Sequence, residues 1–187
     1  MTTTTTTAQT KSRRRERPVT SKERWAWYFY DFGNSAYAAV VLLAVYSAYF
    51  KGQVVGGAEG SRLWGLAVGI AMMVVALISP VLGAIADFSG TKKRFLFFFT
   101  SMAIIFTSLL FFTREGTITM GMIFFILAEI GYRSAQVFYN SLLTEIAEPD
   151  EIGRVSGIGW AIGSAGGILC LLFILPLIMM VEGTLIV

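Results

Sequence analysis

Long apolar stretches separated by short charged segments dominate the sequence. Five of them cover about residues 28–50, 62–86, 94–113, 117–143 and 155–181. A helix needs roughly 20 apolar residues to cross the hydrocarbon layer of a membrane, and each stretch is long enough. Because lipid offers no hydrogen-bond partners to the backbone, each stretch is predicted to be a helix. We therefore expect an all-α membrane protein with five transmembrane helices.

The segment before the first apolar stretch is polar and basic. Residues 1–24 contain a threonine run followed by seven lysines and arginines, and we predict a disordered cytoplasmic arm ahead of a transmembrane helical domain over residues 25–187. Contact with anionic lipid or nucleic acid is one interpretation of the arm. We favour the other, a charge cluster that sets the topology of the first helix, and expect no nucleic-acid partner.

The distribution of basic residues predicts the orientation. Eleven lysines and arginines fall on the side of the N-terminus and three on the opposite side, so the positive-inside rule places the N-terminus in the cytoplasm. The aromatic group Trp25, Trp27, Tyr28 and Tyr30 is typical of the membrane interface. After five spans the chain reaches Thr184 to Val187, an apolar run that we interpret as the start of a sixth span, cut short.

The composition excludes several kinds of chemistry. Histidine is absent and Cys170 is the single cysteine, which excludes a disulfide framework, Cys/His zinc sites and His-based triads. We expect Cys170 to be a small packing residue. No phosphate-binding G-x-x-x-x-G-K-[ST] loop is present, so ATP-driven transport is not supported within this chain. We predict no enzyme activity, no cofactor and no metal site.

The loop between the second and third stretches carries a spaced motif. Its glycines, aspartate and basic residues resemble the G-x-x-x-D-x-x-G-x-[KR]-[KR] signature of the major facilitator superfamily, an interpretation we favour over an ordinary positive-inside loop. Glycines there permit close helix packing or a tight turn, and the aspartate can pair with basic residues or cap a helix. This conformational-gate loop comprises Gly83, Asp87, Gly90, Lys92, Lys93 and Arg94.

Two further motifs narrow the resemblance to one branch of that superfamily. Residues 30–37, YDFGNSAY, are similar to the opening of the vacuole-effluxer-like transporters, and residues 148–161 are similar to the segment leading into their fifth helix. The resemblance implies a secondary transporter with twelve helices in two halves. This chain would be the N-terminal half, and its partner a missing C-terminal half or a second chain. It also implies that the Asp87 loop contacts the other half, and so has no partner here.

The fourth stretch has a polar face. Glu129, Arg133, Gln136 and Asn140 recur at i, i+4, i+7 and i+11, which places them on one side of a helix. Charged groups at the centre of a membrane span are costly, so one interpretation is contact with a substrate or coupling ion. Arg133 suits a carboxylate and Glu129 an ammonium group, so an amino acid would satisfy both. The alternative is a mutually satisfied structural ion pair.

The first and fifth stretches carry weaker patterns. Asp31 and Asn34 share a helix face near the start of the first stretch, where Asp31 could accept a coupling proton or, as we favour, cap the helix. In the fifth, Gly159, Gly163 and Gly167 recur every four residues and are expected to allow close helix packing. Their partial overlap with an antiporter pattern of the superfamily is weak support for export.

The function we expect is secondary active transport of small solutes, with amino-acid efflux or exchange driven by an ion gradient. Proton coupling is favoured because Asp31 and Glu129 are titratable groups in or beside the membrane. The alternatives are a truncated, non-transporting fragment, or a helical half that acts only with a partner chain; a membrane-embedded enzyme is less favoured. We expect an integral membrane protein surrounded by lipid, in a bacterial plasma membrane first and a vacuolar membrane second.

Overall fold

The chain folds into a bundle of long helices. The computed structural model describes the backbone of residues 20–88 and 90–185, and the side chains of residues 20–85 and 90–180. The helical elements are α1 (Ser21–Tyr37), η1 (Ala38–Ala44), α2 (Val45–Tyr49), η2 (Phe50–Val55), α3 (Gly57–Phe88), α4 (Lys92–Leu109), η3 (Leu110–Phe112), α5 (Ile118–Ile146) and α6 (Ile152–Leu185). The first four follow one another directly and form one membrane-length helix, so five helices are long and apolar enough to cross a membrane, as predicted.

The first helix begins earlier than its apolar residues indicate. Thr20 and Glu23 form a capping box, in which the Glu23 carboxylate accepts hydrogen bonds from the backbone N–H and the hydroxyl of Thr20 at 3.3 and 3.1 Å. Residues 21–24, expected to belong to the disordered arm, are therefore helical. The rest of the predicted arm, residues 1–19, lies outside the described part of the chain.

The last helix extends past its predicted end. The helix α6 continues to Leu185, and Ile186 and Val187 lie outside the described residues. The start of a sixth span expected at Thr184 to Val187 therefore stays a prediction.

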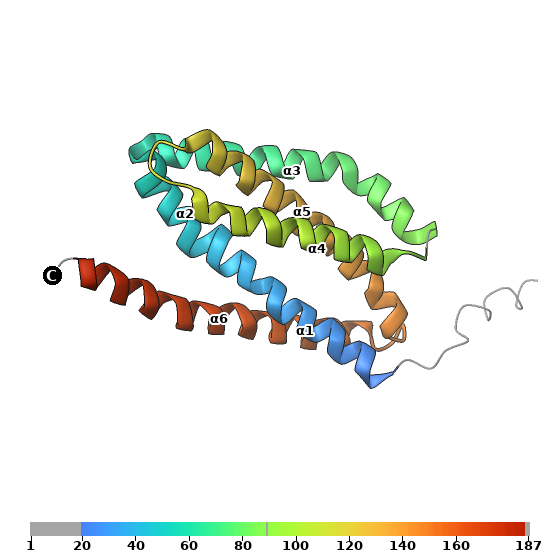
Figure 1. The fold of residues 1–187 in the computed structure, drawn as a ribbon. Helices are drawn as coiled ribbons and strands as arrows, with labels where there is room; N and C mark the ends of the chain where they lie inside the picture. The colour runs from blue at the N-terminus through green and yellow to red at the C-terminus, as the bar shows by residue number, and fades with distance from the viewer. Residues whose placement is uncertain (1–19, 89, 186–187) are drawn as a thin grey trace, which may run out of the picture.

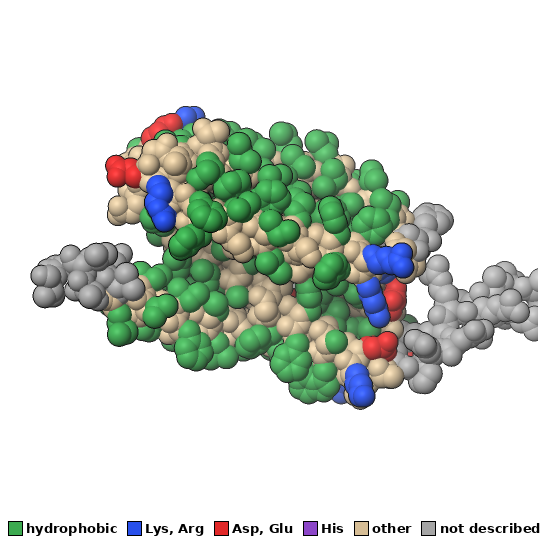
Figure 2. All heavy atoms as spheres, in the orientation of Figure 1, with side chains coloured by type: hydrophobic (Ala, Val, Ile, Leu, Met, Phe, Trp, Pro, Cys, Tyr) green, Lys and Arg blue, Asp and Glu red, His purple; other side chains and the backbone are tan. Residues whose placement is uncertain are grey.

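The helices form two groups, as Figure 1 shows. One group is α3, α4 and α5, in which α5 packs against both of its neighbours, and the other is the pair α1 and α6. Between the groups, α1 and α6 make few contacts with α5, and η2, the end of the first membrane helix, packs against α3. The outward faces are apolar: Leu77, Phe97 and Phe173 are each more than 70% exposed. Figure 2 shows hydrophobic side chains over the middle of the molecule and charged ones near its two ends, as expected for a protein embedded in a membrane.

Glycines of α6 face α1 at very short range. A Cβ at Gly159 would overlap the Trp27 ring, one at Gly163 the Asp31 carboxylate, and one at Gly166 the main chain of Phe32. Gly167 faces the backbone of Ser35, at 3.3 Å from the position of a Cβ. Hence these glycines bring two helix backbones together. This arrangement is common in membranes, where the hydrophobic effect does not drive helices to associate.

Replacing Gly166 by alanine is expected to destabilise the folded chain by about 1–3 kcal/mol, because the methyl group would overlap the Phe32 backbone and force α6 away from α1. Gly157→Ala is the matched control on the same helix, since a Cβ there meets no described atom within 4 Å. Thermal unfolding of both variants in one detergent measures the difference. Equal melting temperatures would show that the two helices do not pack this closely.

Candidate functional site

The polar face predicted in the fourth stretch lies on α5, the helix that contacts both groups. Glu129 has no exposed surface, and its Oε1 accepts a hydrogen bond from Nε of Arg133 at 2.8 Å. The Arg133 side chain is 34% exposed, and its guanidinium carbon lies 5.4 Å from the centre of the Tyr132 ring. The favourable i, i+4 order thus forms an intrahelical ion pair in which the acid is enclosed and the base is partly accessible.

The second carboxylate oxygen of Glu129 has a different environment. Oε2 is buried and accepts no hydrogen bond from a described residue, and the same holds for the hydroxyl of Tyr37 on α1. The Tyr37 hydroxyl nevertheless lies near enough to the Glu129 carboxylate for both a charge interaction and a side-chain hydrogen-bond interaction, and its ring stacks on Tyr132 with centroids 4.6 Å apart. An acid with one bonded and one unbonded oxygen is a costly arrangement in a membrane core.

A polar cavity of about 290 Å³ lies where α1, α5 and α6 meet. It is small for a ligand pocket, close to the size that one small solute fills. Its polar lining residues come from all three helices, and two tryptophans and two tyrosines complete the wall. The lining residues are Asp31 and Ser35 of α1, Gln136 and Asn140 of α5, Ser156 of α6, and Trp27, Tyr132, Tyr139 and Trp160.

The structure thus brings together only part of the predicted site. Asp31, Gln136 and Asn140 share the cavity, whereas Glu129 and Arg133 are not among its lining residues. Asn34 lines a separate, mostly apolar cleft of about 570 Å³ between α1, α4 and α6. The cap of α1 is Thr20, so the favoured role of Asp31 as the helix cap is wrong. Asp31 instead lines the polar cavity, and its role as a proton acceptor stays a prediction.

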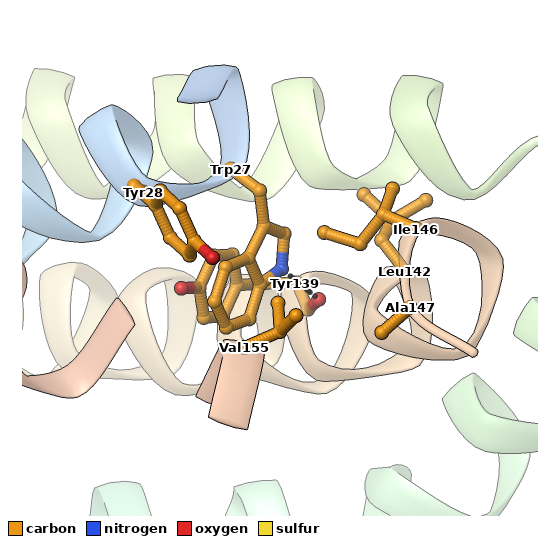
Figure 3. Close-up of a cluster of buried hydrophobic side chains, with 7 residues drawn as sticks. All are labelled: Trp27, Tyr28, Tyr139, Leu142, Ile146, Ala147 and Val155. Carbon is orange, nitrogen blue, oxygen red and sulfur yellow. Dashed lines mark hydrogen bonds between the residues drawn. The ribbon is translucent and has the colours of Figure 1, made fainter. Parts of the chain in front are cut away.

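Stacked aromatic rings fix α1 against α5 beside this cavity (Figure 3). The rings of Trp27 and Tyr139 stack with centroids 4.3 Å apart and an interplanar angle of 7°, and the indole N–H of Trp27 donates to the carbonyl of Tyr139 at 3.1 Å. Trp27 and Tyr28 are each only 7% exposed, so the interpretation of these two residues as part of an interfacial belt is wrong; Trp25, at 53% exposed, does face outward. Aromatic residues that pack inside the bundle and those that face the lipid headgroups look alike in the sequence. Only tertiary packing distinguishes the two.

The gate loop is only partly described. The side chain of Asp87 lies outside the described residues, and a Cβ on Gly83 would meet no described atom within 4 Å. Gly90 has a φ of +57°, as the predicted tight turn requires. Lys92 pairs with Glu145 of α5 at 2.8 Å and donates to the carbonyl of Ser141 at 3.2 Å, so this cation of the loop has a partner within the chain.

The neighbouring end of the bundle has a second ionic cluster. Arg24 of α1 contacts Glu151 with a 2.5 Å hydrogen bond and donates to the carbonyl of Ile146 at 3.0 Å, while Arg154 reaches the other oxygen of Glu151 at 2.8 Å. This cluster ties the start of α1 to the loop between α5 and α6. Hydrogen bonding to Arg24 lowers the pKa of the Glu151 carboxyl below its ordinary value.

Nothing in the described part of the chain suggests a metal centre. No group of three or more acidic, histidine or cysteine side chains that could hold an ion occurs among the described residues. The polar residues that line the cavity offer hydrogen bonding and charge pairing. Four residues of this region were not among the site candidates: Ser35, Ser156 and Trp160, which line the cavity, and Tyr37, whose hydroxyl is buried near Glu129. Nothing along the chain indicates that three separate helices meet at the cavity.

Five helices that are long and apolar enough to cross a membrane, three of which line a polar cavity, define a polytopic α-helical membrane protein. Comparison with known proteins narrows this class. Residues 64–153 match the family described as "Vacuole effluxer Atg22 like". The resemblance to vacuole-effluxer-like transporters of the major facilitator superfamily is therefore confirmed.

Two relatives show how far the similarity extends. The chain is 29% identical over 166 residues to the uncharacterized MFS-type transporter YxiO of Bacillus subtilis (strain 168), which covers 87% of this chain and 39% of that protein. It is 26% identical over 149 residues to an uncharacterized protein of Aquifex aeolicus (strain VF5), covering 80% of this chain and 37% of the relative. The chain thus spans less than two fifths of the length of either. No solved structure matches the chain.

Removing the base of the buried pair is expected to destabilise the chain more than removing both charges. Arg133→Gln leaves the enclosed Glu129 without its partner, at a cost of about 3 kcal/mol, because a buried unpaired carboxylate lacks solvation. The double variant Glu129→Gln/Arg133→Gln replaces both charges by neutral amides and should recover part of the loss. Unfolding measurements on both in one detergent provide the comparison. A double variant as unstable as the single one, or less stable, would contradict a coupled pair.

The link between Arg24 and Glu151 is expected to make stability depend on pH. Because the folded-state pKa of Glu151 is lowered, the link stabilises the chain above the ordinary glutamate value of about 4.3 and is lost as pH falls through the lowered value. Between about pH 5 and 3, the melting temperature of the wild type should therefore fall further than that of Glu151→Gln. Asp150→Asn, which removes an exposed carboxylate one residue away, should follow the wild type. Parallel curves for wild type and Glu151→Gln would argue against the link.

Proposed function

We propose that the chain forms the N-terminal half of a secondary active transporter for small solutes. The observation that carries this proposal is the polar cavity shared by α1, α5 and α6 in an otherwise apolar bundle. The cavity lies beside a buried ion pair and offers hydrogen-bond partners to a polar solute within the membrane. The name of the Bacillus subtilis relative, an MFS-type transporter, supports the same function, and the remainder of such a longer protein would supply the opposite wall.

The chemistry of the cavity favours a zwitterion such as an amino acid. Asp31 offers a carboxylate to an ammonium group, and Gln136 and Asn140 offer amides that donate and accept. Arg133 does not line the cavity, but it lies one helical turn before Gln136, its side chain is partly exposed, and its N–H groups beyond the Nε bond to Glu129 are suited to a substrate carboxylate. In this proposal Asp31 takes the ammonium-binding role for which the sequence suggested Glu129, because Glu129 is enclosed.

Ion-gradient coupling is part of the proposal. Glu129 has one oxygen bonded to Arg133 and one without a described partner, so its carboxylate has a position at which a proton can be held. Asp31 is the second acid that could exchange protons, since it faces the cavity. The transport proposed is gradient-driven efflux or exchange, with no cofactor and no enzymatic step.

We place the N-terminus in the cytoplasm, by the excess of basic residues on its side, and favour a bacterial plasma membrane over a vacuolar one. Cys170 is the single cysteine, so a Cys170→Ser background allows topology to be mapped with new cysteines. A cysteine at position 150 should then be shielded from membrane-impermeant thiol reagents in intact cells, and one at position 115 should react. The reverse pattern would overturn the orientation.

Asp31→Asn in the complete transporter that contains this chain is expected to reduce amino-acid transport at least tenfold, because it removes the anionic partner of the ammonium group. Radiolabelled amino acids, scanned in liposomes with and without a pH gradient, provide the measurement. Glu115→Gln removes an exposed carboxylate far from the cavity and should leave transport unchanged. A wild type that moves none of the amino acids would refute the substrate class, and an active Asp31→Asn would refute the role of Asp31.

Glu129→Gln distinguishes coupling from binding. If Glu129 holds the coupling proton, this variant should lose gradient-driven accumulation while retaining exchange of labelled for unlabelled substrate. If Glu129→Gln still accumulates substrate in response to the pH gradient, Glu129 does not hold the coupling proton, and its ion pair with Arg133 has only a structural role.

A further inference from the structure

A further cavity, which we call the groove, lies at the end of the bundle where α1 and α4 begin. It has a volume of about 510 Å³ and lies between Ala26 and Tyr30 of α1 and Leu96 of α4, with Leu142 and Ile146 of α5 also lining it. Its walls are thus largely aliphatic and aromatic. Because α1 and α4 belong to different helix groups and make few contacts with each other, the groove lies along a loosely packed part of the boundary between the groups.

The rim of this groove is basic. Lys93 lines both the groove and an adjoining cavity of about 500 Å³, which also contains Lys92 and Arg94 at the start of α4. Lys92 is paired with Glu145, whereas Lys93 and Arg94 are exposed and form no ion pair with a described residue. The positive end of the α4 helix dipole adds to the field of these two cations.

An acid, Glu23, also lies at the rim. The carboxylate of Glu23 accepts the capping-box hydrogen bonds of Thr20, as described for the start of α1. Glu145 is likewise bound to Lys92. Hydrogen bonds from a neutral threonine leave the Glu23 charge in place, so the rim keeps a net positive charge, from Lys93 and Arg94 against Glu23.

Exposed aromatic side chains mark the depth of this site in the membrane. Trp25 and Phe29 on α1, and Phe97 and Phe98 on α4, are each more than half exposed and flank the groove within about one or two turns of its rim. Exposed aromatic rings next to lysine and arginine at a helix end are typical of the headgroup region. Figure 2 shows charged side chains at this end of the molecule next to the apolar surface. Lipid is therefore the medium into which the groove opens.

We propose that this groove is a binding site for an anionic phospholipid. The phosphate-containing headgroup is held by Lys93 and Arg94, and one acyl chain lies in the slot between α1 and α4 against Leu96, Leu142 and Ile146. A zwitterionic lipid fills the slot equally well but gains less from the two cations. A free phosphate finds the same cations but loses the apolar contact. The combination of a basic rim with an apolar slot thus selects a molecule that has both parts.

The test is a titration of the purified chain, in a neutral detergent, with phosphatidylglycerol or phosphatidylcholine of identical acyl chains, with bound lipid counted by native mass spectrometry. We expect the wild type to bind phosphatidylglycerol more tightly than phosphatidylcholine. Lys93→Gln/Arg94→Gln should weaken phosphatidylglycerol binding roughly tenfold or more and leave phosphatidylcholine binding nearly unchanged. Arg62→Gln/Arg114→Gln removes the same charge at the opposite end of the bundle and should bind like the wild type.

Two further measurements make the outcome decisive. Thermal unfolding establishes that each variant is folded, and glycerol phosphate replaces the lipid to separate a free anion from a membrane lipid. Stabilisation by glycerol phosphate equal to that by phosphatidylglycerol would overturn the proposal in favour of a soluble anion site. Equal binding of the two lipids by the wild type, or unchanged phosphatidylglycerol binding by folded Lys93→Gln/Arg94→Gln, would also overturn it.

Discussion

The absence of water in the hydrocarbon layer is the constraint on which this structure depends. Lipid tails are as apolar as the side chains facing them, so helix association needs close backbone approach and polar contacts rather than hydrophobic burial. The chain meets this need in two ways. Gly163 and Gly166 let α6 lie directly on α1, and Gly131 does the same for α5 against the backbone of Ala103 on α4. Between the two groups the contact is largely aromatic: Trp27 stacks on Tyr139, and Tyr46 and Phe50 of the first membrane helix pack against Trp64 and Phe125.

The same constraint explains why the two acids in the bundle have different environments. Glu129 is enclosed, and Arg133 four residues later offsets the cost of its charge without help from another helix. Asp31 has no ion pair with a described residue, but it faces a cavity with two amides and two serine hydroxyls. A buried acid with a fixed partner stabilises one arrangement, whereas an acid facing a polar cavity is available to a solute. The two acids therefore have separate roles in the proposed transport.

The sequence predicted the features that depend on neighbours along one helix. The five membrane helices follow from the length of the apolar stretches. The polar face of α5 and the pairing of Glu129 with Arg133 follow from helical periodicity. It did not predict features that depend on which helices meet. Nothing in the sequence distinguishes Gly163, which faces Asp31, from Gly83, which meets no described atom, although both had been interpreted as packing glycines. For the same reason Asp31 could be placed on a face of its helix but not in a cavity with Gln136.

The position of the candidate site follows from how packing is distributed. Contacts are dense within each helix group, whereas α1 and α6 make few with α5, so movement of α1 and α6 relative to α5 disrupts fewer contacts than movement within either group. The polar cavity lies across this boundary, with Asp31 and Ser156 on one side and Gln136 and Asn140 on the other. A solute that bonded to both sides would supply contacts that the helices themselves lack there. Its binding free energy would then depend on the relative position of the groups, which is the physical requirement for coupling binding to a conformational change.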